Sequence, residues 1–474
     1  MLRTLRSILF RPVPIATLVW LRIAVGILGV CDVIGHFAYY HLWEHAYDAD
    51  KFHFAYYGFE WVHPLPEPFM SLYFITLLGL GVSVVLGWRF RITAPLFALG
   101  YTGVFLLEKA HYLNHGYLFC WLLWILAVSP VWREWSHDVR ARPGLRRTTV
   151  PYWNLFIFQA MMGIVYFFGG IAKLNADWMI DAMPLKIWLP AKAARPIIGP
   201  LLELEATAYF MSWGGAFLDL FVVPLLIWKR TRWLAFGMVV FFHLCNHLIF
   251  NIGIFPYLSL VLTSLYFRPD WPQRGINWLA GRWAWVSRWK DRRLERLAAA
   301  PAAPMWQADP RHARPILIGL GLLFALHIFL PLRNHFFDSD VAWSEEGHRY
   351  SWRMMLRTKA GYGHLKMVDR ATQKEEIINT YDYLSNKQAR KMATHPDMIL
   401  SFAHYIAARE KEKGRDVAVY SNFKVRLNGR DGNFLIDPER DLTQIHWTWR
   451  TTKDWILPET EQGLKDGGSE GVRD

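Results

Sequence analysis

Long apolar runs separated by short polar stretches constrain this chain more than any other feature of its sequence. They fall at about Ile15–Tyr39, Phe69–Gly87, Ala94–Leu107, Tyr117–Val131, Leu155–Ile171, Ala206–Trp228, Leu234–Phe250, Ile254–Phe267 and Ile316–Leu330. A helix rises about 1.5 Å per residue, so about 20 apolar residues cross the hydrocarbon core of a bilayer. Although some runs are short, they predict a mainly α, polytopic transmembrane helical bundle of about nine spans, one of them broken.

The composition is typical of a membrane protein. Of the 474 residues, 53% are hydrophobic and 16% aromatic, 25 are tryptophan, and only 20% are charged. Trp and Tyr are favoured at membrane interfaces because their rings tolerate both environments. The basic residues behind the net charge of +13 are spread over short loops, which argues against a nucleic-acid partner. Cys31, Cys120 and Cys245 all lie in apolar runs and form neither a disulfide framework nor a zinc pattern.

The loop charges predict an orientation in the membrane. One set of loops is rich in basic residues: Arg3, Arg6, Arg11, Arg89, Arg91, Arg133, Arg140, Arg142, Arg146, Arg147, Lys229, Arg230, Arg232 and the stretch from Arg268 to Arg314. The opposite loops mix bases with acids. The positive-inside rule therefore predicts a cytoplasmic N-terminus, with Lys173 and the C-terminal part on the other side. Residues 1–14 are predicted to form a basic interfacial helix rather than a signal peptide.

The composition becomes that of a soluble protein after about Leu330. We expect a transmembrane bundle over residues 15–331, a smaller extracytoplasmic α+β domain rich in β-hairpins over residues 332–458, and a flexible tail over residues 459–474. Tyr350–Thr358 and Leu365–Ile378 alternate like paired strands, and Lys387–Lys413 has the pattern of one amphipathic helix. The turn-forming residues 428–432 predict a hairpin.

One apolar run, Leu155–Ile171, leads directly to Lys173. A charge at the centre of a membrane helix costs about 2.5–3.5 kcal/mol, and less toward the interface. One interpretation is a lysine whose ammonium group reaches out to water. The other is an amine kept uncharged by its apolar surroundings, which could act as a general base.

Further polar residues lie in or beside the apolar runs. Asn114 and His115 lie between two runs, and Asp219 lies within one. His243, Asn246 and His247 share one helix face, which must look into the bundle because unsatisfied polar groups are costly in lipid. This pattern lacks a third metal ligand, so no metal is expected. A purely structural hydrogen-bond network stays an alternative, for Asp219 in particular.

The interruption at Asn251–Pro256 predicts a broken helix that lines a cavity. Together with Lys173 and the polar residues, it places a functional site in the half of the bundle nearest the C-terminal part.

These residues and their neighbours resemble the vitamin K-dependent γ-glutamyl carboxylase family, as a bacterial-type member of the horizontally transferred transmembrane domain class. The stretches that carry the resemblance are Asn114–Leu118, Pro151–Asn154, Val165–Trp178, Phe242–Asn246, Phe250–Tyr257, Tyr350–Met355 and Ile436–Pro438. They follow in order from about Leu21 to about Leu457.

The resemblance implies a carbon-carbon lyase that oxidises reduced vitamin K, a naphthohydroquinone, with O2 to the epoxide. In this family the oxidation is coupled to γ-carboxylation of a peptide glutamate with CO2. The resemblance assigns the base to Lys173, and the stabilisation of developing negative charge to His115 with Asn114. The residues expected to bind the quinone are His243, Asn246, Asp219, Trp178 and Phe250, and those expected to bind the glutamate substrate are His348, Arg349, Tyr350 and Trp352. The implied partners are the lipid bilayer, the naphthoquinone and a secreted or extracytoplasmic glutamate-containing peptide.

Two departures from the family pattern bear on peptide recognition. Vertebrate members of the family are longer, and Gly347-His348-Arg349 stands where the family has apolar and aromatic residues. Quinol epoxidation without carboxylation is therefore one alternative. The family's disulfide is also missing, which points to a bacterial cytoplasmic membrane. A proton-coupled transporter and a non-catalytic anchor that docks a partner are further alternatives.

Overall fold

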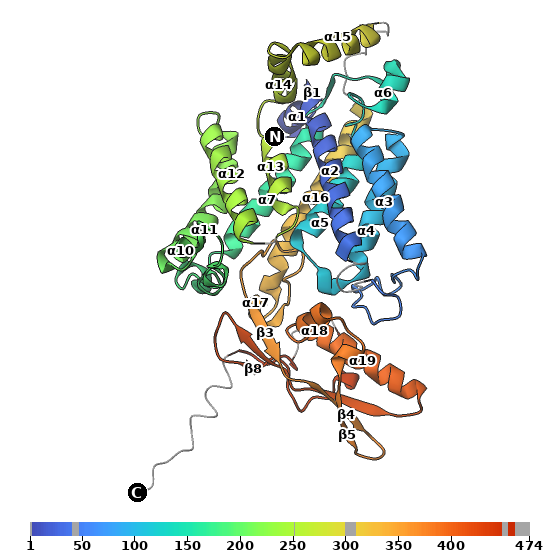
Figure 1. The fold of residues 1–474 in the computed structure, drawn as a ribbon, viewed down its shortest axis with the longest axis vertical. Helices are drawn as coiled ribbons and strands as arrows, with labels where there is room; N and C mark the ends of the chain where they lie inside the picture. Colours follow the sequence, from blue (N-terminus) through green and yellow to red (C-terminus); the bar gives the residue numbers. More distant parts are fainter. Residues whose placement is uncertain (1, 40–46, 251, 299–309, 448–453, 460–474) are drawn as a thin grey trace.

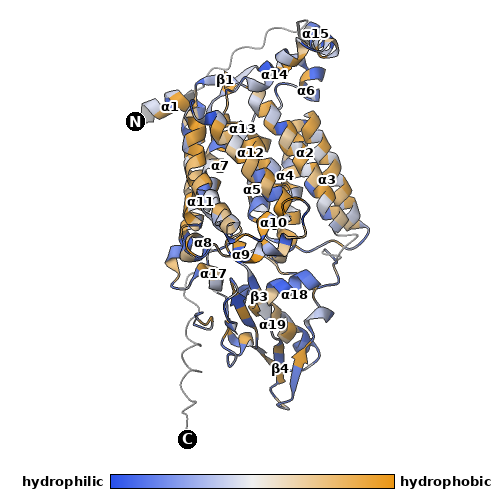
Figure 2. Ribbon diagram, turned by 60° about the vertical axis from the view of Figure 1, so that its left-hand side comes forward, coloured by the Kyte–Doolittle hydropathy of each residue, from blue (hydrophilic) through white to orange (hydrophobic). Residues whose placement is uncertain are grey.

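The computed structural model describes residues 2–39, 47–250, 252–298, 310–447 and 454–459. Among them, seven helices are long and apolar enough to cross a membrane: α2 (Ala16–Tyr39), α3 (Phe69–Leu86), α4 (Phe90–Leu107), α7 (Trp153–Ala172), α11 (Glu205–Ile227), α12 (Arg232–Ile249) and α16 (Pro310–Leu332). Two shorter apolar helices are α5 (Asn114–Val128) and α13 (Phe255–Ser264). The predicted polytopic helical bundle is confirmed, and Figure 2 shows its hydrophobic helices above a more hydrophilic domain.

The predicted break falls between α12 and α13. The first of these helices ends at Ile249, and the second begins at Phe255, with Pro256 in its first turn. Asn251 lies outside the described residues. Gly253 has a φ of +58°, a left-handed conformation that favours glycine. The backbone between the two helices is therefore not helical, and Phe250 and Gly253 in this stretch line a cavity.

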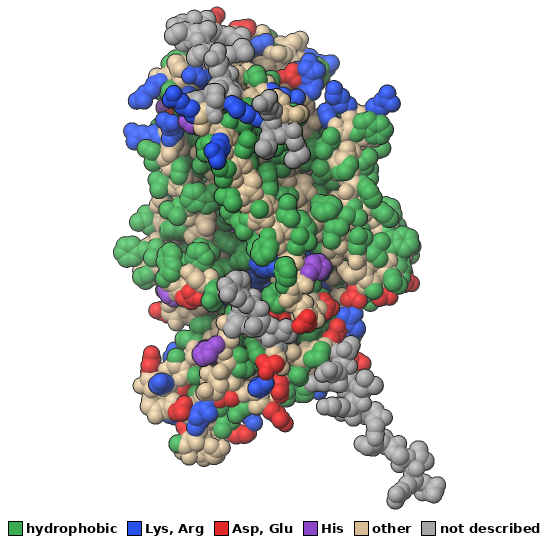
Figure 3. Space-filling model, turned by 180° about the vertical axis from the view of Figure 1, so that it is seen from behind, with side chains coloured by type: hydrophobic (Ala, Val, Ile, Leu, Met, Phe, Trp, Pro, Cys, Tyr) green, Lys and Arg blue, Asp and Glu red, His purple; other side chains and the backbone are tan. Residues whose placement is uncertain are grey.

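The end of the bundle opposite the C-terminal domain is basic. Short helices lie there, namely α1 (Leu2–Leu9), α6 (His137–Ala141), α14 (Trp271–Ala280) and α15 (Ala284–Ala298), as Figure 1 shows. Figure 3 shows Lys and Arg side chains gathered at this end, beyond a broad hydrophobic band. This charge distribution agrees with the loop pattern in the sequence, and the side of the membrane on which it lies stays a prediction.

The sequence predicted one helix over residues 1–14, but the structure shows a shorter helix followed by a strand. The helix α1 ends at Leu9, and β1 (Pro12–Pro14) pairs with β2 (Thr149–Pro151) in an antiparallel ladder. Two prolines in three residues prevent the helix from continuing, because proline lacks the N–H donor and its ring clashes with the preceding turn. The ladder holds the segment against the residues that lead into α7.

The C-terminal domain contains two antiparallel sheets. One has the order β3 (Lys359–Tyr362), β7 (Lys424–Leu427), β8 (Asn433–Phe434), and the other the order β5 (Glu375–Ile378), β4 (Leu365–Asp369), β6 (Val417–Ser421). The register pairs Leu365 with Ile378 in the β4–β5 hairpin. The β7–β8 hairpin predicted around residues 428–432 is present. Two helices, α18 (Asn386–Met392) and α19 (Pro396–Glu412), complete the domain's hydrophobic core.

Short helices connect these elements. They are α8 (Ala176–Met179), α9 (Leu185–Trp188), α10 (Gly199–Leu202), α17 (Val341–Ser344) and the 3-10 helices Lys109–His111, Pro143–Leu145, Pro190–Lys192, Arg333–Phe336, Thr380–Asp382 and Leu442–Gln444.

Three secondary-structure predictions for this domain are wrong. The strand expected over Leu365–Ile378 is the hairpin of β4 and β5. The single helix expected over Lys387–Lys413 is two helices, because Pro396 has no N–H donor and opens a new helix at its first turn. The strand expected over Tyr350–Thr358 is irregular. Tyr350, Trp352 and Met355 have φ angles of 65°, 58° and 55°, which no strand accommodates. The segment 350–356 instead enters the bundle, where Trp352 is 1% exposed and packs against core residues.

Polar contacts fix the C-terminal domain to the end of the bundle where α7 terminates. Lys109 forms an ion pair of 2.8 Å with Asp397, and the Asp177 carboxylate lies 2.8 Å from the Arg430 guanidinium. The Gln388 amide donates to Glu108 at 2.7 Å. The junction between the two parts is therefore a set of buried and half-buried charge contacts around a cavity.

Candidate active site

A cavity of about 550 Å³ lies between the bundle and the C-terminal domain. Ten of the predicted site residues line it: Asn114, His115, Lys173, Trp178, Asp219, His243, Asn246, Phe250, His348 and Arg349. Tyr350 and Trp352 do not. The Tyr350 backbone N–H donates to the Tyr112 hydroxyl at 2.6 Å, and the Trp352 ring packs near Tyr117 and His327 inside the bundle. The Tyr350 backbone and the Trp352 ring thus help to hold the segment 350–356 in place.

Lys173 is buried and contacts Asp219. It follows the last residue of α7 and is 5% exposed, while Asp219, in the middle of α11, is 6% exposed. The Lys173 Nζ lies 2.6 Å from Asp219 Oδ2 and 3.2 Å from the Gly169 carbonyl oxygen. The interpretation of a lysine that reaches bulk water is therefore wrong. Asp219, expected to contact the quinone, lines the cavity and forms a direct pair with Lys173, and its contact with the quinone stays a prediction.

Glycines on both helices leave room for this pair. A Cβ on Gly169 would lie 3.3 Å from Asp219 Oδ2, and one on Gly215 would lie 3.6–4.0 Å from Phe242, Trp178 and the Lys173 Cε. The indole of Trp178 lies 5.5 Å from the Lys173 Nζ and donates to the Ser212 carbonyl at 2.7 Å. Gly215 therefore keeps the cavity open beside the lysine.

Asn114 and His115 make different kinds of contact. The Asn114 amide oxygen accepts from the Tyr112 hydroxyl at 2.8 Å, and its NH2 donates to the Arg353 carbonyl at 3.2 Å. Both ends of this amide thus bind the protein, which favours a positioning role. The His115 ring stacks on Phe255 with 5.8 Å between centroids, and among the described residues it makes no hydrogen bond. His115 is therefore free to contact a ligand.

The face of α12 presents His243 and Asn246 to the cavity, as the sequence predicted. His243 lies beside Phe255, with 5.7 Å between ring centroids, so Phe255 separates it from His115. The third residue of the pattern, His247, is exposed and hydrogen-bonds the Tyr257 hydroxyl at 3.1 Å. It lies about 40° around α12 from His243, on the side away from Asn246, so the prediction that all three residues face the bundle interior is wrong for His247. Nowhere in the described ranges do three or more His, Cys, Asp or Glu side chains gather as a metal site.

The cavity has a basic end where the C-terminal domain meets the bundle. We define it as Lys109 from the bundle and, from the C-terminal part, Arg349, Arg353, Arg357, Lys359, Lys387, Arg390 and Lys391. Two buried acids offset part of this charge. Asp397 binds Lys109 and Arg349, and Glu345 binds Arg357 and Lys359. In the part of the chain that the structure describes, Arg353, Arg390 and Lys391 form no ion pair. The basic end therefore carries a net positive charge.

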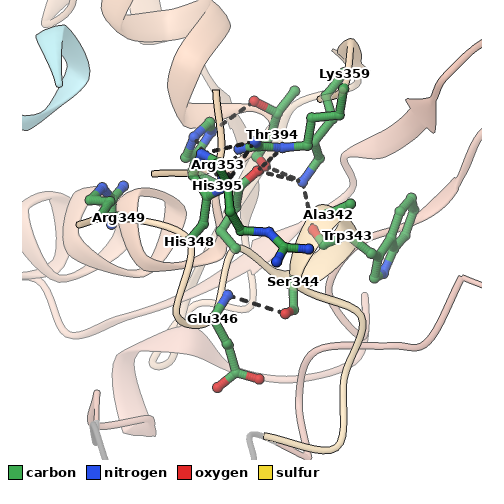
Figure 4. A network of polar contacts seen from close by, with 12 residues as sticks. Ala342, Trp343, Ser344, Glu346, His348, Arg349, Arg353, Lys359, Thr394 and His395 are labelled. Carbon is green, nitrogen blue, oxygen red and sulfur yellow. Dashed lines mark hydrogen bonds and ion pairs between the residues drawn. The ribbon is translucent and has the colours of Figure 1, made fainter. Parts of the chain in front are cut away.

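Burial and ion pairs set the charges in this region. Burial lowers the pKa of Lys359 to about 8, although Glu345 opposes the shift. Burial alone would raise the pKa of Glu345, but Arg357 and the other cations hold it well below its usual range. In Figure 4, Lys359 lies between Trp343 and Thr394, whose carbonyls accept from its Nζ at 2.6 and 2.8 Å. Glu345 is thus ionised, and its carboxylate holds the Arg357 and Lys359 side chains in place.

The sequence did not single out Tyr166, whose hydroxyl lies 2.9 Å from His243 Nε2. It also did not single out the unpaired cations of the basic end. Tyr166 lies seven residues before Lys173, two helical turns away on the same face of α7, and helical spacing could have identified it. The cations come from α18 and from the segment 350–356, so only the folded chain brings them together.

Two family models match the chain. The model described as the HTTM domain matches residues 10–271, more than half of the chain, and the model described as the vitamin K-dependent gamma-carboxylase, lumenal domain, matches residues 312–462. No solved structure matched the chain. The first match covers the helices that carry Lys173, Asp219 and His243, and the second covers the segment 350–356 and the basic end.

Proposed function

The chain belongs to the vitamin K-dependent gamma-carboxylase family, and from this premise we propose that it oxidises reduced vitamin K with O2 to the epoxide and carboxylates peptide glutamate with CO2. One observation carries the proposal: the buried Lys173–Asp219 pair lies in the same cavity as His115 and His243. The family match supports a multi-pass membrane protein that uses reduced vitamin K.

The residues of the cavity are compatible with a naphthohydroquinone. Aromatic side chains from three helices, among them Trp178, Phe242 and Phe255, line its bundle end. Polar groups are few there, as in most sites for flat apolar ligands. His243 Nδ1 is buried and has no hydrogen-bond partner among the residues that the structure describes. When bound, the hydroquinone supplies the redox chemistry, since its oxidation by O2 yields the strong base that removes the γ-proton.

Lys173 is the group that accepts the hydroxyl proton of the hydroquinone. This step requires an uncharged amine beside the Asp219 carboxylate, a state in which the pair carries one negative charge that the accepted proton neutralises. Asp219 then stabilises the ammonium at 2.6 Å, and the Gly169 carbonyl at the end of α7 also accepts from it. The aromatic rings of Trp178 and Phe242 line the cavity near the pair and lower the local dielectric constant, which strengthens these contacts.

The experiment that tests the proposal measures epoxide. Detergent-solubilised protein is supplied with vitamin K hydroquinone and O2, and the products are separated by chromatography. Epoxide formation that depends on the protein supports the proposal. Protein that binds the quinone but forms no epoxide contradicts it. Labelled CO2 and a glutamate peptide, added in a parallel reaction, separate carboxylation from epoxidation alone.

The basic end supports the carboxylation half of the proposal. A glutamate side chain is an anion, and clefts lined by one sign of charge concentrate ligands of the opposite sign. His348 and Arg349 lie on the wall of this end, next to cations without ion pairs. The glutamate is therefore proposed to enter from the C-terminal domain, while the quinone occupies the bundle end.

Charge reversal in the basic end is expected to impair peptide use. Arg390→Glu with Lys391→Glu should raise the KM for an acidic peptide at least about tenfold, with epoxidation in the absence of peptide unchanged. Arg409→Glu is the control, because Arg409 contacts Tyr405 on α19 away from the cavity. Steady-state carboxylation assays measure the effect. An unchanged KM in the double variant would rule out the basic end as the peptide site.

Gly215 offers a test of the quinone site. Gly215→Leu should abolish quinone binding, because its side chain would fill the space beside Lys173 and Trp178, whereas Gly215→Ala makes only ordinary contacts. The adjacent Gly214 has no atom within 4 Å of a Cβ, so Gly214→Leu is a matched control. Fluorescence titration with a naphthoquinone measures binding. Equal affinity in Gly215→Leu and Gly214→Leu would place the quinone elsewhere.

A further inference from the structure

His243 is unusual among the residues that line the cavity. Of those that the structure describes, it is the one with a fully buried side-chain atom that makes no hydrogen bond. The residue is 1% exposed, and its Nε2 lies 2.9 Å from the Tyr166 hydroxyl, while Nδ1 has no partner. Buried polar atoms without partners are rare because they lose their bonds to water. Protein atoms enclose Nδ1 in the structure, so we expect it to meet a ligand atom once a neighbouring side chain moves aside.

The hydrogen bond of the Tyr166 hydroxyl to Nε2 determines whether Nδ1 is a donor or an acceptor. A neutral imidazole has one donor and one acceptor nitrogen, and no acidic side chain of the described residues contacts His243. The hydroxyl makes its one hydrogen bond within the described residues to Nε2. If it donates, the single group left over is Nδ1–H. If it accepts, both the hydroxyl hydrogen and the Nδ1 lone pair are left over. Donation by Tyr166 to Nε2 leaves one hydrogen-bonding group without a partner rather than two, so we expect the tautomer with the proton on Nδ1.

The surroundings of His243 define the shape of the ligand. Phe242 and Phe255 contact the imidazole edge-on, at 5.2 and 5.7 Å between ring centroids. Phe255 also stacks on His115 at 5.8 Å. Flat aromatic walls with one polar atom between them favour a flat aromatic ligand that carries an oxygen on its rim.

We infer that Tyr166 is a positioning residue that fixes the tautomer of His243, so that Nδ1–H is presented to an acceptor oxygen of a flat aromatic ligand. This inference rests on the proposed function and deepens it, since it assigns one ring oxygen of the quinone to His243. A donor fixed in this way binds more tightly as the ring oxygen gains negative charge. Tyr166 itself need not touch the ligand oxygen.

The experiment uses menadione, the naphthoquinone head group without its tail, and full-length protein in detergent. Quenching of tryptophan fluorescence gives the Kd, and isotope-edited infrared spectra report hydrogen bonding to the quinone carbonyls. Tyr166→Phe is compared with Tyr266→Phe, a buried tyrosine outside the cavity whose hydroxyl donates to the Gln159 carbonyl at 2.7 Å. His243→Leu and the double variant with Tyr166→Phe complete the set.

Tyr166→Phe is expected to weaken menadione binding about three- to tenfold, the range of one hydrogen bond, and to reduce the carbonyl shift. Tyr266→Phe should change neither. The double variant should bind no more weakly than His243→Leu alone, because Tyr166 acts through His243. If Tyr166→Phe binds with the wild-type Kd and carbonyl shift, or if the effects add, the inference is wrong and the proposed function stands. If wild-type protein does not bind menadione, both are wrong.

Discussion

Replacement of Lys173 by Met is expected to reduce vitamin K epoxidation by about 10²–10⁴-fold, the usual contribution of a general base. The amine is the one basic nitrogen in contact with Asp219 among the described residues, and Met has a similar length without a proton-accepting nitrogen. The fold should persist with a lower Tm, because Met removes the partner of the buried Asp219 carboxylate. Epoxide formation measured by chromatography, at saturating hydroquinone, gives the comparison.

Lys186→Met is the matched control for this variant. Lys186 lies at the same end of the bundle, where it pairs with Glu205 and hydrogen-bonds the Tyr209 hydroxyl at the surface. It does not line the cavity. Equal turnover by wild type and Lys173→Met would remove Lys173 from the mechanism. A non-catalytic role of the whole polar cluster predicts that outcome, with a loss of thermal stability as the only effect of Lys173→Met, because Asp219 loses its partner.

The largest loss of stability is expected for Asp397→Asn. Asp397 is buried between Lys109 and Arg349, at 2.8 and 2.7 Å, and links the C-terminal domain to the bundle. Removal of the carboxylate charge leaves two buried cations without an anion, which costs about 3–5 kcal/mol. A thermal unfolding curve in detergent should show a marked drop in Tm. Asp416→Asn is the control, because Asp416 is exposed and lies 3.5 Å from Arg370.

The same contact predicts a dependence of stability on pH. Burial alone would raise the pKa of Asp397, but Arg349 and Lys109 hold it below its usual range. A carboxylate with a lowered pKa in the folded state stabilises the fold above its unfolded pKa of about 4, and this contribution is lost as the pH falls further. Wild-type Tm should therefore fall below about pH 4. A similar Tm profile in Asp397→Asn over that range would contradict this assignment.

The sequence was informative wherever one helix carries the pattern. The apolar runs predicted the spans, because burial in lipid leaves few alternatives to a helix. His243 and Asn246 were placed on one cavity-lining face by their spacing, and the break before Phe255 followed from Gly253 and Pro256. These features depend on neighbours in the chain, so no tertiary structure was needed to predict them.

Contacts between distant segments could not be predicted in this way. Nothing near Asp219 in the sequence indicates that it pairs with Lys173, because the pairing depends on how α7 and α11 pack. The segment 350–356 alternates like a strand, yet Trp352 follows the shape of the bundle core rather than a sheet. The basic end likewise depends on docking of α18, which brings Arg390 to the cavity.

The path of the segment 350–356 has a consequence for how this molecule can be assembled or taken apart. The Trp352 carbonyl and the Met354 side chain come within 4 Å of a Cβ placed on Gly169, next to Asp219. One wall beside the Lys173–Asp219 pair is therefore made of residues that are synthesised late. The transmembrane bundle alone therefore lacks part of the wall of the cavity. In chimaeras that exchange the two parts between relatives, the segment 350–356 must therefore come from the same protein as the bundle. Otherwise we expect the cavity wall to be incomplete and water to reach Lys173.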